Sequence, residues 1–458
     1  MDPIANVATK LEARTSSFVR EERLPGAMVG VVDKTGMVWS AAVGFADVGE
    51  RRPPDAGTLY RVASITKTIT GTAIMQLRDA GKLHLDDPAV EHLPELRRAT
   101  APFGRIEHVT IRRMLSHESG LAGDPPGTEW ADGDYEGNPR KNLARAELIG
   151  TKIPSNLHHK YSNLAYQLLG EVVARASGAP YVEYVNDEIL QPLEMHSSAF
   201  EPLPAEWSGR RATGYAGRSF SDFLDVASEV KPCTSEGGLW SCLGDMAKWV
   251  RAQIATADDR GRRPRVLEVS TLKEMHTPRY LGDDEWTEAW GISWYAIRRN
   301  DCVWVQHSGG LPGFNTNVCF DPKEGVGAVA LINGVASASD LAMDLASIAR
   351  DAVRAVPQPI LPASPVPESY RSLLGFYLER QEAVLLRLEW RDRELVFVDP
   401  DDETWRPTLD PTDNPDVFVV RPGVRESGEE VIFRRSTDGR VSAVLLASTN
   451  FVRLDAVR

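Results

Sequence analysis

Cysteine is scarce in this sequence. Its 458 residues include four cysteines, at positions 233, 242, 302 and 319, and no two of them form a Cys-x-x-Cys pair. Closely spaced cysteine pairs are the usual signature of a structural zinc site. We therefore expect reduced, partly buried thiols, and we predict no metal site and no cofactor.

Long apolar runs are also absent. No stretch of 18 apolar residues occurs, so we expect no membrane-spanning helix and no membrane partner. The first 22 residues are amphipathic and charged, without the apolar core and cleavage site of a secretory signal. We expect a cytoplasmic protein; the alternative is that an export leader has been trimmed away.

Nucleotide-binding loops and a surplus of positive charge are missing as well. Neither G-x-x-x-x-G-K-[ST] nor G-x-G-x-x-G occurs in the chain. The 65 acidic side chains exceed the 52 lysines and arginines, which gives a net charge of −13. This excess of negative charge argues against nucleic acid as a partner. The length allows two or three globular domains.

The stretch from Tyr60 to Lys67, Tyr-Arg-Val-Ala-Ser-Ile-Thr-Lys, carries the first candidate for chemistry. An apolar run leads into a helix that we expect from about Ser64 to Ala80, with Gly81 as its stop. Residues three apart share one helix face, so the Lys67 amine can lie against the Ser64 hydroxyl. A serine hydroxyl becomes a strong nucleophile when a nearby base takes its proton. A lysine whose pKa is lowered by its surroundings can be that base.

The Ser-x-x-Lys spacing is weak by itself, because Ser228…Lys231 and Ser270…Lys273 share it. A proline directly follows Lys231, which argues against a continuing helix there. The other pair is typical of the solvated face of a short polar helix. Partner motifs further along the chain are what single out Ser64.

Two such motifs follow Ser64. Tyr161-Ser-Asn163 opens a helix with an apolar stripe, and His307-Ser-Gly-Gly310 ends a run typical of a strand. Tyr-x-Asn recurs as Tyr184-Val-Asn186 inside a later helix, so it too is weak alone. His117, in a polar turn, is interpreted as a histidine that braces a loop rather than as a catalytic base.

Periodicity predicts a first domain over residues 1–355 that combines an antiparallel sheet with helices. Residues 85–230 are mainly helical in pattern, and residues 122–160 are predicted to form a long surface loop. The predicted strands come from both ends of this domain: 27–32, 37–43, 291–295, 302–306, 316–320 and 326–332. Residues 356–368 form a stiff proline-rich linker. Residues 369–458 show short strands with polar turns, a spacing that favours a small β-barrel.

In their order, Ser64-x-x-Lys67, Tyr161-x-Asn163 and His307-Ser-Gly309 resemble the motifs of the penicillin-recognising serine enzymes, in particular class C β-lactamases, D-peptidases and related esterases. The resemblance covers about residues 5–355. It implies an α/β (α+β) fold of the serine β-lactamase and penicillin-binding-protein type, with an antiparallel sheet and a helical subdomain. The C-terminal domain is then expected to be a lipocalin-like β-barrel.

The resemblance also implies catalytic roles. Ser64 attacks a carbonyl group, while Lys67 and Tyr161 exchange the proton as general base and acid. Asn163 holds the Lys67 amine and the substrate amide. The backbone N–H groups of Ser64 and Gly310 are expected to form the oxyanion hole.

The third motif departs from the β-lactamase pattern, because His307 stands where those enzymes carry a lysine. A permanent cation that would bind a substrate carboxylate is thus replaced by a group that is mostly neutral at pH 7. This weakens the β-lactamase and carboxypeptidase interpretations and favours relatives such as D-aminopeptidases, esterases and thioesterases. Ser308 and Gly309 are expected to line the substrate site.

Three further residues, Glu236, Gly237 and Arg453, are predicted to bind substrate. Glu236 precedes Gly237 in a Gly-Gly turn, and its carboxylate could hold the N-terminal ammonium of a peptide. A plain surface glutamate is the alternative. In the C-terminal domain, Arg453 is predicted to help position the substrate chain.

We favour a penicillin-binding-protein-type thioesterase that releases and cyclises a non-ribosomal peptide from a thioester of its C-terminal D-residue. The alternative is a serine hydrolase of D-amino-acid peptides, amides or esters. The expected partners are a peptidyl thioester or a peptide, with a peptidyl carrier protein as its possible donor. The sequence leaves the oligomeric state open.

Overall fold

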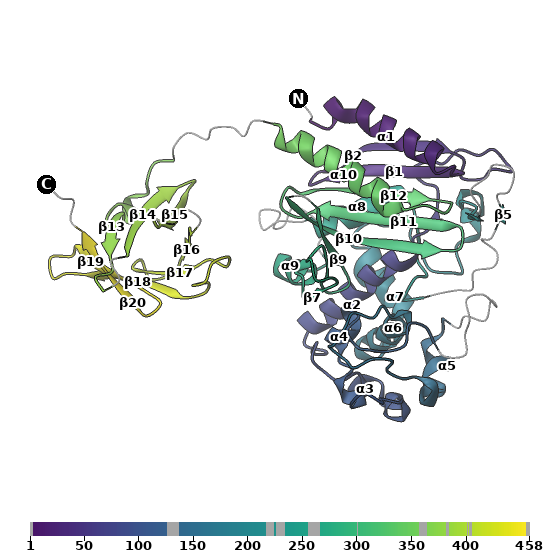
Figure 1. Cartoon of the computed structure of the whole chain (residues 1–458), viewed down its shortest axis with the longest axis horizontal. Helices are drawn as coiled ribbons and strands as arrows, with labels where there is room; N and C mark the ends of the chain where they lie inside the picture. Colours follow the sequence, from purple (N-terminus) through teal and green to yellow (C-terminus); the bar gives the residue numbers. More distant parts are fainter. Residues whose placement is uncertain are drawn as a thin grey trace. The chain divides into compact units, whose positions relative to one another are not determined.

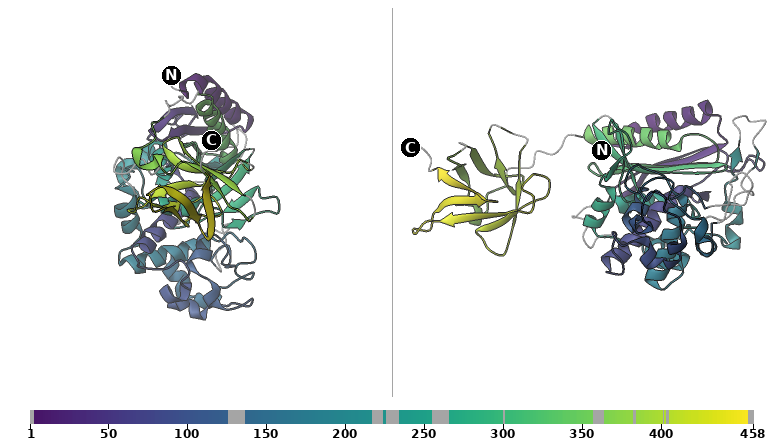
Figure 2. Two further views of the ribbon diagram at one scale, coloured as in Figure 1. Left: turned by 90° about the vertical axis from the view of Figure 1, so that its left-hand side faces the viewer. Right: turned by 60° about the horizontal axis from the view of Figure 1, so that its bottom comes forward.

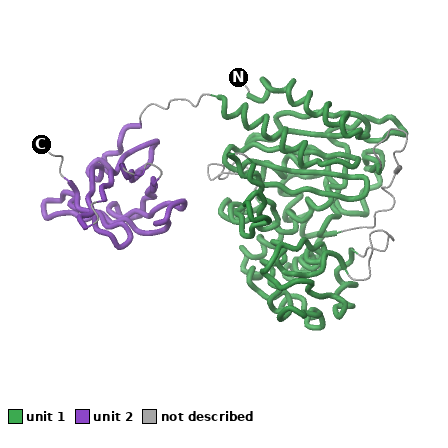
Figure 3. The backbone as a smooth tube through the Cα atoms, in the orientation of Figure 1, with its two compact units in different colours: residues 1–356 green, residues 357–458 purple. Residues whose placement is uncertain are grey.

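The computed structural model of the chain describes residues 3–125, 137–216, 224–225, 234–254, 266–299, 301–356, 364–381, 384–400, 402 and 405–454. The chain divides into two compact units, residues 1–356 and 357–458, which Figure 3 shows in different colours. Much of the linker predicted over 356–368 lies outside the described residues, which resume at residue 364.

An eight-stranded sheet forms the centre of the first unit, in the order β2-β1-β12-β11-β10-β9-β8-β7. The two ends of the unit meet in it, because β1 (Gly26–Asp33) pairs antiparallel with β12 (Val326–Ile332). The other strands are β2 (Gly36–Gly44), β7 (Tyr280–Leu281), β8 (Glu288–Trp290), β9 (Tyr295–Arg299), β10 (Cys302–Leu311) and β11 (Phe314–Asp321). This confirms the predicted antiparallel sheet built from both ends of the domain.

Both faces of this sheet are covered by helices. In Figures 1 and 2, α1 (Ala8–Glu21) and α10 (Ala338–Arg354) run together over one face. Alternation along β1 sends Val29 and Val31 toward this pair, whereas Met28 and Val32 belong to the core on the opposite face. That second core contains α8 (Leu243–Gln253) and α2 (Thr66–Asp79).

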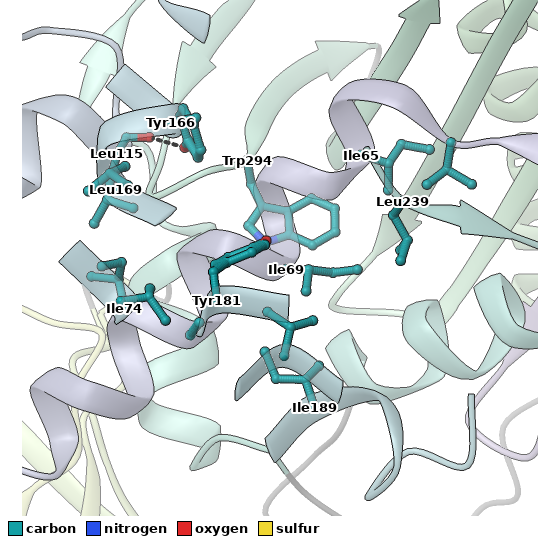
Figure 4. Packing of buried hydrophobic residues seen from close by; sticks show 14 of the residues in the cluster. Ile65, Ile69, Ile74, Leu115, Tyr166, Leu169, Tyr181, Ile189, Leu239 and Trp294 are labelled. Carbon is teal, nitrogen blue, oxygen red and sulfur yellow. Dashed lines mark hydrogen bonds between the residues drawn. The ribbon is translucent and has the colours of Figure 1, made fainter. Parts of the chain in front are cut away.

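The second core continues into the helical subdomain. Ile69 and Ile74 of α2 belong to the same buried cluster as Tyr166 and Leu169 of α6 (Asn163–Ser177), and Figure 4 draws these side chains. The Tyr166 hydroxyl donates to the Leu115 carbonyl at 2.7 Å, which ties α6 to α4. The described residues of the unit also form the α-helices α3 (Ala89–His92), α4 (Ile111–Leu115), α5 (Pro139–Ala144), α7 (Tyr181–Val185) and α9 (Val269–His276).

Three predicted elements differ in the structure. The segment expected as a long surface loop over 122–160 contains α5 and a 3₁₀ helix over Ala146–Leu148, and Leu143, Ala146 and Ile149 are buried there. The helix expected from Ser64 begins as α2 at Thr66, and Ser64 lies in a preceding 3₁₀ turn, η2 (Ala63–Ile65). The strand expected over 291–295 is largely a turn between β8 and β9. There the Ile292 and Ser293 N–H groups donate to the carbonyls of Met275 and Leu115 instead of to a neighbouring strand. The wrong prediction arose because this turn carries buried apolar side chains, Ile292 and Trp294, as a buried strand does.

The second unit contains a closed barrel of eight antiparallel strands, which confirms the predicted barrel. Each strand pairs with the next, and β13 (Gly375–Leu378) pairs with β20 (Thr449–Leu454) to close the barrel. The others are β14 (Leu385–Arg391), β15 (Glu394–Val398), β16 (Thr408–Pro411), β17 (Val417–Val420), β18 (Glu430–Arg435) and β19 (Val441–Leu446). Its interior is filled by its own apolar side chains, including Phe397, Phe418 and Phe433.

No helix in the described part of the chain combines the length and the apolar character that a bilayer crossing requires. Three of the four cysteines, Cys242, Cys302 and Cys319, are buried free thiols. Cys233 lies outside the described residues.

Candidate active site

The turn that carries Ser64 is held by the segment that follows Glu236. Strand β3 (Tyr60–Arg61) pairs with β6 (Trp240–Ser241), and the Val62 N–H donates to the Leu239 carbonyl at 3.0 Å. Ser64 stays partly exposed at the end of this arrangement. A partly exposed hydroxyl on a fixed turn can reach a substrate carbonyl.

Lys67 lies one helical turn after Ser64 and is completely buried. Its Nζ atom is 3.1 Å from Ser64 Oγ, 2.8 Å from Asn163 Oδ1 and 2.6 Å from the Glu236 carbonyl oxygen. The last two oxygens only accept hydrogen bonds, whereas the hydroxyl can donate one. A neutral amine can therefore give both of its N–H bonds to these carbonyls and keep its lone pair for the Ser64 proton.

Tyr161 completes the group around the nucleophile. Its hydroxyl is hydrogen-bonded to Ser64, and its ring centroid lies 5.0 Å from Lys67 Nζ. Burial raises the pKa of Tyr161 well above its usual range, although the Ser64 hydrogen bond opposes this shift. The phenol is thus protonated near neutral pH and is suited to pass a proton to a leaving group.

Asn163 is the first residue of α6, and its amide is fixed from two sides. Lys67 donates to Oδ1, while Nδ2 donates to Asp124 Oδ1 at 2.8 Å. Ser162 caps the helix by accepting the Ala165 N–H at 3.0 Å. Since the Asp124 carboxylate only accepts, Nδ2 must face it, and this determines the orientation of the amide.

The Glu236 carboxylate is enclosed by protein groups and so does not take the substrate-binding role that the sequence suggested. It is 2% exposed, and its oxygens accept from Gln167 Nε2 at 2.9 Å and from the Thr234 N–H at 3.1 Å. Burial is the largest influence on its pKa and raises it. This position does not support direct contact with a substrate ammonium; the residue instead serves Lys67 through its backbone carbonyl.

His307 faces the same buried region from strand β10. Its Nδ1 atom is 2.7 Å from the Ser308 carbonyl, which can only accept, so Nδ1 carries the proton. Burial is the largest influence on the pKa of His307 and lowers it to about 3. The ring is therefore neutral at pH 7, as the sequence suggested.

The two residues after His307 point in opposite directions, as strand alternation requires. A Cβ atom on Gly309 would lie 2.1 Å from the Val62 carbonyl oxygen, so this face of β10 packs directly on the Ser64 turn. Ser308 lines a groove of about 560 Å³ with Ser339 and Met343 of α10, on the other side. Its hydroxyl thus lies away from Ser64, and its carbonyl is the group that meets His307.

Gly310 follows on the same strand and is exposed. A Cβ atom there would meet only Asn315 Oδ1, at 3.9 Å. This open space leaves room for a substrate oxygen near the Gly310 backbone. The oxyanion pair of Ser64 and Gly310 stays a prediction.

Two more residues were predicted to bind substrate, Gly237 and Arg453. Gly237 is buried in the turn that begins at Thr234, whose carbonyl accepts the Gly238 N–H at 2.8 Å. Arg453 lies on β20, where its guanidinium donates to the Leu374 carbonyl at 2.9 Å within the barrel. Its role toward substrate stays a prediction.

Of the alternative Ser-x-x-Lys pairs, the one that lies in the described residues has no such surroundings. Ser270 and Lys273 are exposed on α9, which confirms the solvated face predicted for them. Ser228 and Lys231 lie outside the described residues. Within the described ranges, no group of three or more His, Cys, Asp and Glu side chains is arranged to hold a metal ion.

Comparison with known proteins shows the family of this chain. A family model described as Beta-lactamase matches residues 11–352. The chain belongs to the Beta-lactamase family. It is a member of the penicillin-recognising serine enzymes, a family of serine hydrolases, as its three motifs indicated.

Two relatives show how far this similarity extends. Protein flp of Staphylococcus aureus (strain MW2) is 26% identical over 321 residues, which are 69% of this chain but only 61% of that protein. D-alanyl-D-alanine-carboxypeptidase/endopeptidase AmpH of Escherichia coli (strain K12) is 27% identical over 306 residues, 63% of this chain and 75% of that protein.

Solved structures share the fold. The octameric penicillin-binding protein homologue from Pyrococcus abyssi matches with a TM-score of 0.63 at 22% identity, over 97% of this chain and 99% of that one. SurE matches with a TM-score of 0.59 at 24% identity, over 99% of both chains. A class C β-lactamase matches with a TM-score of 0.62 at 20% identity, over 77% of this chain and 98% of that one.

Within the Beta-lactamase family fold, His117 braces the site instead of acting as a base. It is fully buried, its Nδ1 accepts the Ser162 N–H at 3.0 Å, and its ring stacks on Tyr161 with centroids 4.2 Å apart. Burial lowers the pKa of His117 well below its usual value. The structure thus supports the loop-bracing interpretation.

The sequence interpretation missed two polar residues at this site. Gln167 holds the Glu236 carboxylate, and Asp124 holds the Asn163 amide. Gln167 stands four residues after Asn163, so helical spacing could have placed both on one face. Asp124 had no comparable signal, because only the folded loop brings it to the start of α6.

Proposed function

We propose that this enzyme transfers a peptidyl group from a thioester to Ser64 and then to the amine of the same peptide, which closes a ring. The observation that carries the acyl-enzyme chemistry is the set of three oxygens around Lys67 Nζ, with Ser64 Oγ at 3.1 Å. Buried bases of this kind activate a serine hydroxyl toward carbonyl carbon.

In the first half-reaction the Ser64 proton moves to Lys67 as Oγ bonds to the thioester carbonyl carbon. The carbon–sulfur bond then breaks, and the proton passes through Tyr161 to the departing sulfur, which leaves as a thiol. Ser64 now carries the acyl group as an ester, and Lys67 is neutral again. A peptidyl carrier protein would be the natural donor of such a thioester.

In the second half-reaction a neutral amine attacks the ester carbonyl and gives one proton to Lys67. The bond from the carbonyl carbon to Ser64 Oγ breaks, and Oγ takes the proton back. The products are a cyclic amide and the free serine. Water in place of the amine gives the linear acid by the same steps.

The neutral state of His307 supports a substrate without a free C-terminal carboxylate. Because the pKa of His307 is lowered to about 3, the ring has no charge to offer a carboxylate at pH 7. Thioesters, esters and amides carry no such charge at the reacting end. For the same reason we propose that β-lactams with an anionic carboxylate are poor substrates.

The names of two similar proteins support a substrate peptide that ends in a D-residue. One relative is named a D-alanyl-D-alanine-carboxypeptidase/endopeptidase, and one solved neighbour is SurE with D-Leu. The motifs and the appended barrel also resemble those of the penicillin-binding-protein-type thioesterases that cyclise non-ribosomal peptides. A cytoplasmic location would fit that role.

A hydrolase of D-amino-acid peptides, amides or esters is the second candidate. The relative named as a carboxypeptidase and endopeptidase favours it, since the same acyl-enzyme serves both reactions. The two functions differ only in what attacks the Ser64 ester.

The test uses a linear peptide thioester with an L-residue at its N-terminus and a D-residue at its C-terminus. We expect wild type to give mainly the cyclic peptide, which is one water lighter than the acid by mass spectrometry. Ser64→Ala should release no product, and a fluorophosphonate should label Ser64 in wild type only. Linear acid as the sole product from several such peptides, with rapid cleavage of D-amino-acid amides, would establish the hydrolase instead.

A further inference from the structure

The negative charges of two carboxylates, Asp124 and Glu236, contribute to the raised pKa of the Tyr161 hydroxyl. They differ in accessibility. Glu236 is 2% exposed and is engaged by Gln167 and the Thr234 N–H, whereas Asp124 is partly exposed. Of this pair, Asp124 is therefore the carboxylate that a substrate can approach.

The loop that carries Asp124 is firmly attached to the start of α6. The Gly123 carbonyl accepts the N–H groups of Asn163 at 2.7 Å and Leu164 at 3.1 Å. The Ser162 hydroxyl donates to the Ala122 carbonyl at 2.6 Å. These bonds hold the carboxylate at the positive end of a 15-residue helix, where a negative charge is favoured.

A short chain of groups connects this carboxylate to the nucleophile. Asp124 Oδ1 accepts from Asn163 Nδ2 at 2.8 Å, and Asn163 Oδ1 accepts from Lys67 Nζ at 2.8 Å. Lys67 then reaches Ser64. One side-chain amide and the lysine amine are all that separate the carboxylate from the reacting hydroxyl.

We propose that Asp124 binds an ammonium group of the substrate and so selects peptides that carry a free amine. The inference rests on the proposed acyl-enzyme function and adds the recognition of the acceptor end to it. In the sequence interpretation this role belonged to Glu236, whose carboxylate is enclosed. The ammonium can come from the peptide N-terminus or from a lysine-type side chain.

A purely positioning role for Asp124 makes a different prediction. If the carboxylate only orients the Asn163 amide, its replacement should impair every substrate to the same degree. Asp124→Asn separates the two roles, because the new amide oxygen can still accept from Asn163 Nδ2 while the charge is lost.

The experiment measures thiol release from three peptide thioesters. One has a free N-terminus, one is N-acetylated, and one is N-acetylated but contains a lysine side chain. Thiol release reports formation of the acyl-enzyme whichever acceptor follows, so it is independent of cyclisation. Asp351→Asn, an equal charge change at an exposed site of α10 on the far face of the sheet, is the control.

We expect wild type to prefer one of the ammonium-bearing peptides over the acetylated peptide in kcat/KM. Asp124→Asn should reduce that preference about tenfold, mainly through KM, as loss of a charge-assisted hydrogen bond predicts. Asp351→Asn should retain the wild-type preference. The lysine-containing peptide shows which ammonium is recognised.

An unchanged preference in Asp124→Asn, or an equal loss on all three peptides, would overturn the proposal. Protection of Ser64 from fluorophosphonate labelling by the same peptides gives the comparison without turnover. The inference can thus fail or stand even if the thioesters are not turned over, a result that would count against the proposed function alone.

Discussion

At the scale of single residues, the reactivity of Ser64 depends on what surrounds one nitrogen atom. Lys67 is fully buried, and two of its partners are carbonyl oxygens. Removing an amine from water disfavours its charged form, and carbonyl partners offset that cost less than a carboxylate would. The site therefore favours a lysine that can accept a proton.

Tyr161→Phe should slow acyl-enzyme formation by on the order of 10²–10⁴-fold, because the hydroxyl next to Ser64 is lost. The fold should be little changed, since the ring that stacks on His117 remains. Pre-steady-state thiol release measures the effect. Tyr184→Phe, in the other Tyr-x-Asn sequence, is the control and should react at the wild-type rate. Near-normal turnover in Tyr161→Phe would move the proton transfer to another group.

His276 provides a pH-dependent stability test away from the reacting groups. Its Nε2 lies 3.1 Å from Gln253 Oε1, and burial lowers the pKa of His276 to about 3. Below the unfolded pKa of about 6.5, only the unfolded chain takes up this proton. The stability that neutral His276 provides is thus complete above pH 6.5 and is lost as the pH falls toward 3.

His276→Gln should make the unfolding free energy less dependent on pH between about 4 and 6.5, by up to about 1.4 kcal/mol per pH unit. Urea denaturation at several pH values measures this slope. The variant should be less stable than wild type at pH 7.5, because the packing against Phe320 and Trp294 changes. A slope equal to that of wild type would show that His276 is not neutral in the folded protein.

At the scale of elements, the active site depends on the close contact between strand β10 and turn η2. Gly309 is the residue that permits it, because any side chain would collide with the Val62 carbonyl and the Thr316 hydroxyl. The Thr316 hydroxyl also donates to the Val62 carbonyl at 2.9 Å. The strand thereby fixes the position of the turn that presents Ser64.

Gly309→Ala should lower kcat/KM by on the order of 10²-fold, because it displaces the nucleophile from β10. Overpacking should also cost roughly 1–3 kcal/mol of stability. Gly209→Ala is the matched control, since a Cβ atom there meets nothing within 4 Å. Thioester kinetics and urea denaturation separate the two effects. Wild-type kinetics in Gly309→Ala would show that the contact does not position Ser64.

At the scale of the whole molecule, the two units have separate cores. The buried clusters of the first unit end with Ala349 on α10, and the barrel cluster begins at Leu373. Among the described residues, each cluster draws its buried members from one unit only. A unit that buries its own apolar core can fold alone.

A chain that ends at Val356 should therefore fold and retain the reactive serine. We expect its melting temperature to lie within about 4 °C of the corresponding transition of the full chain. Fluorophosphonate labelling of Ser64 should persist at a similar rate. Aggregation of the shortened chain, or loss of labelling, would show that the first unit needs the barrel. Peptide product ratios with and without the barrel then report its part in the second half-reaction.

The sequence by itself determined the parts that depend on local pattern. Alternation and helical spacing identified most strands, the helices α2 and α6, and the barrel, because burial of one face imposes a period on the chain. Ser64, Lys67, Tyr161, Asn163 and His307 were found because their spacing and order match known motifs. A short buried turn such as residues 291–294 has no such period, so it was mistaken for a strand.

Tertiary structure alone decided where each side chain points. The Glu236 carboxylate turned inward to Gln167, and the Ser308 hydroxyl turned to the far face of β10. Asp124 reached Asn163 only through a loop fixed on α6. These outcomes depend on contacts between residues far apart in the chain, where packing space and available partners determine orientation, and no local pattern encodes either of them.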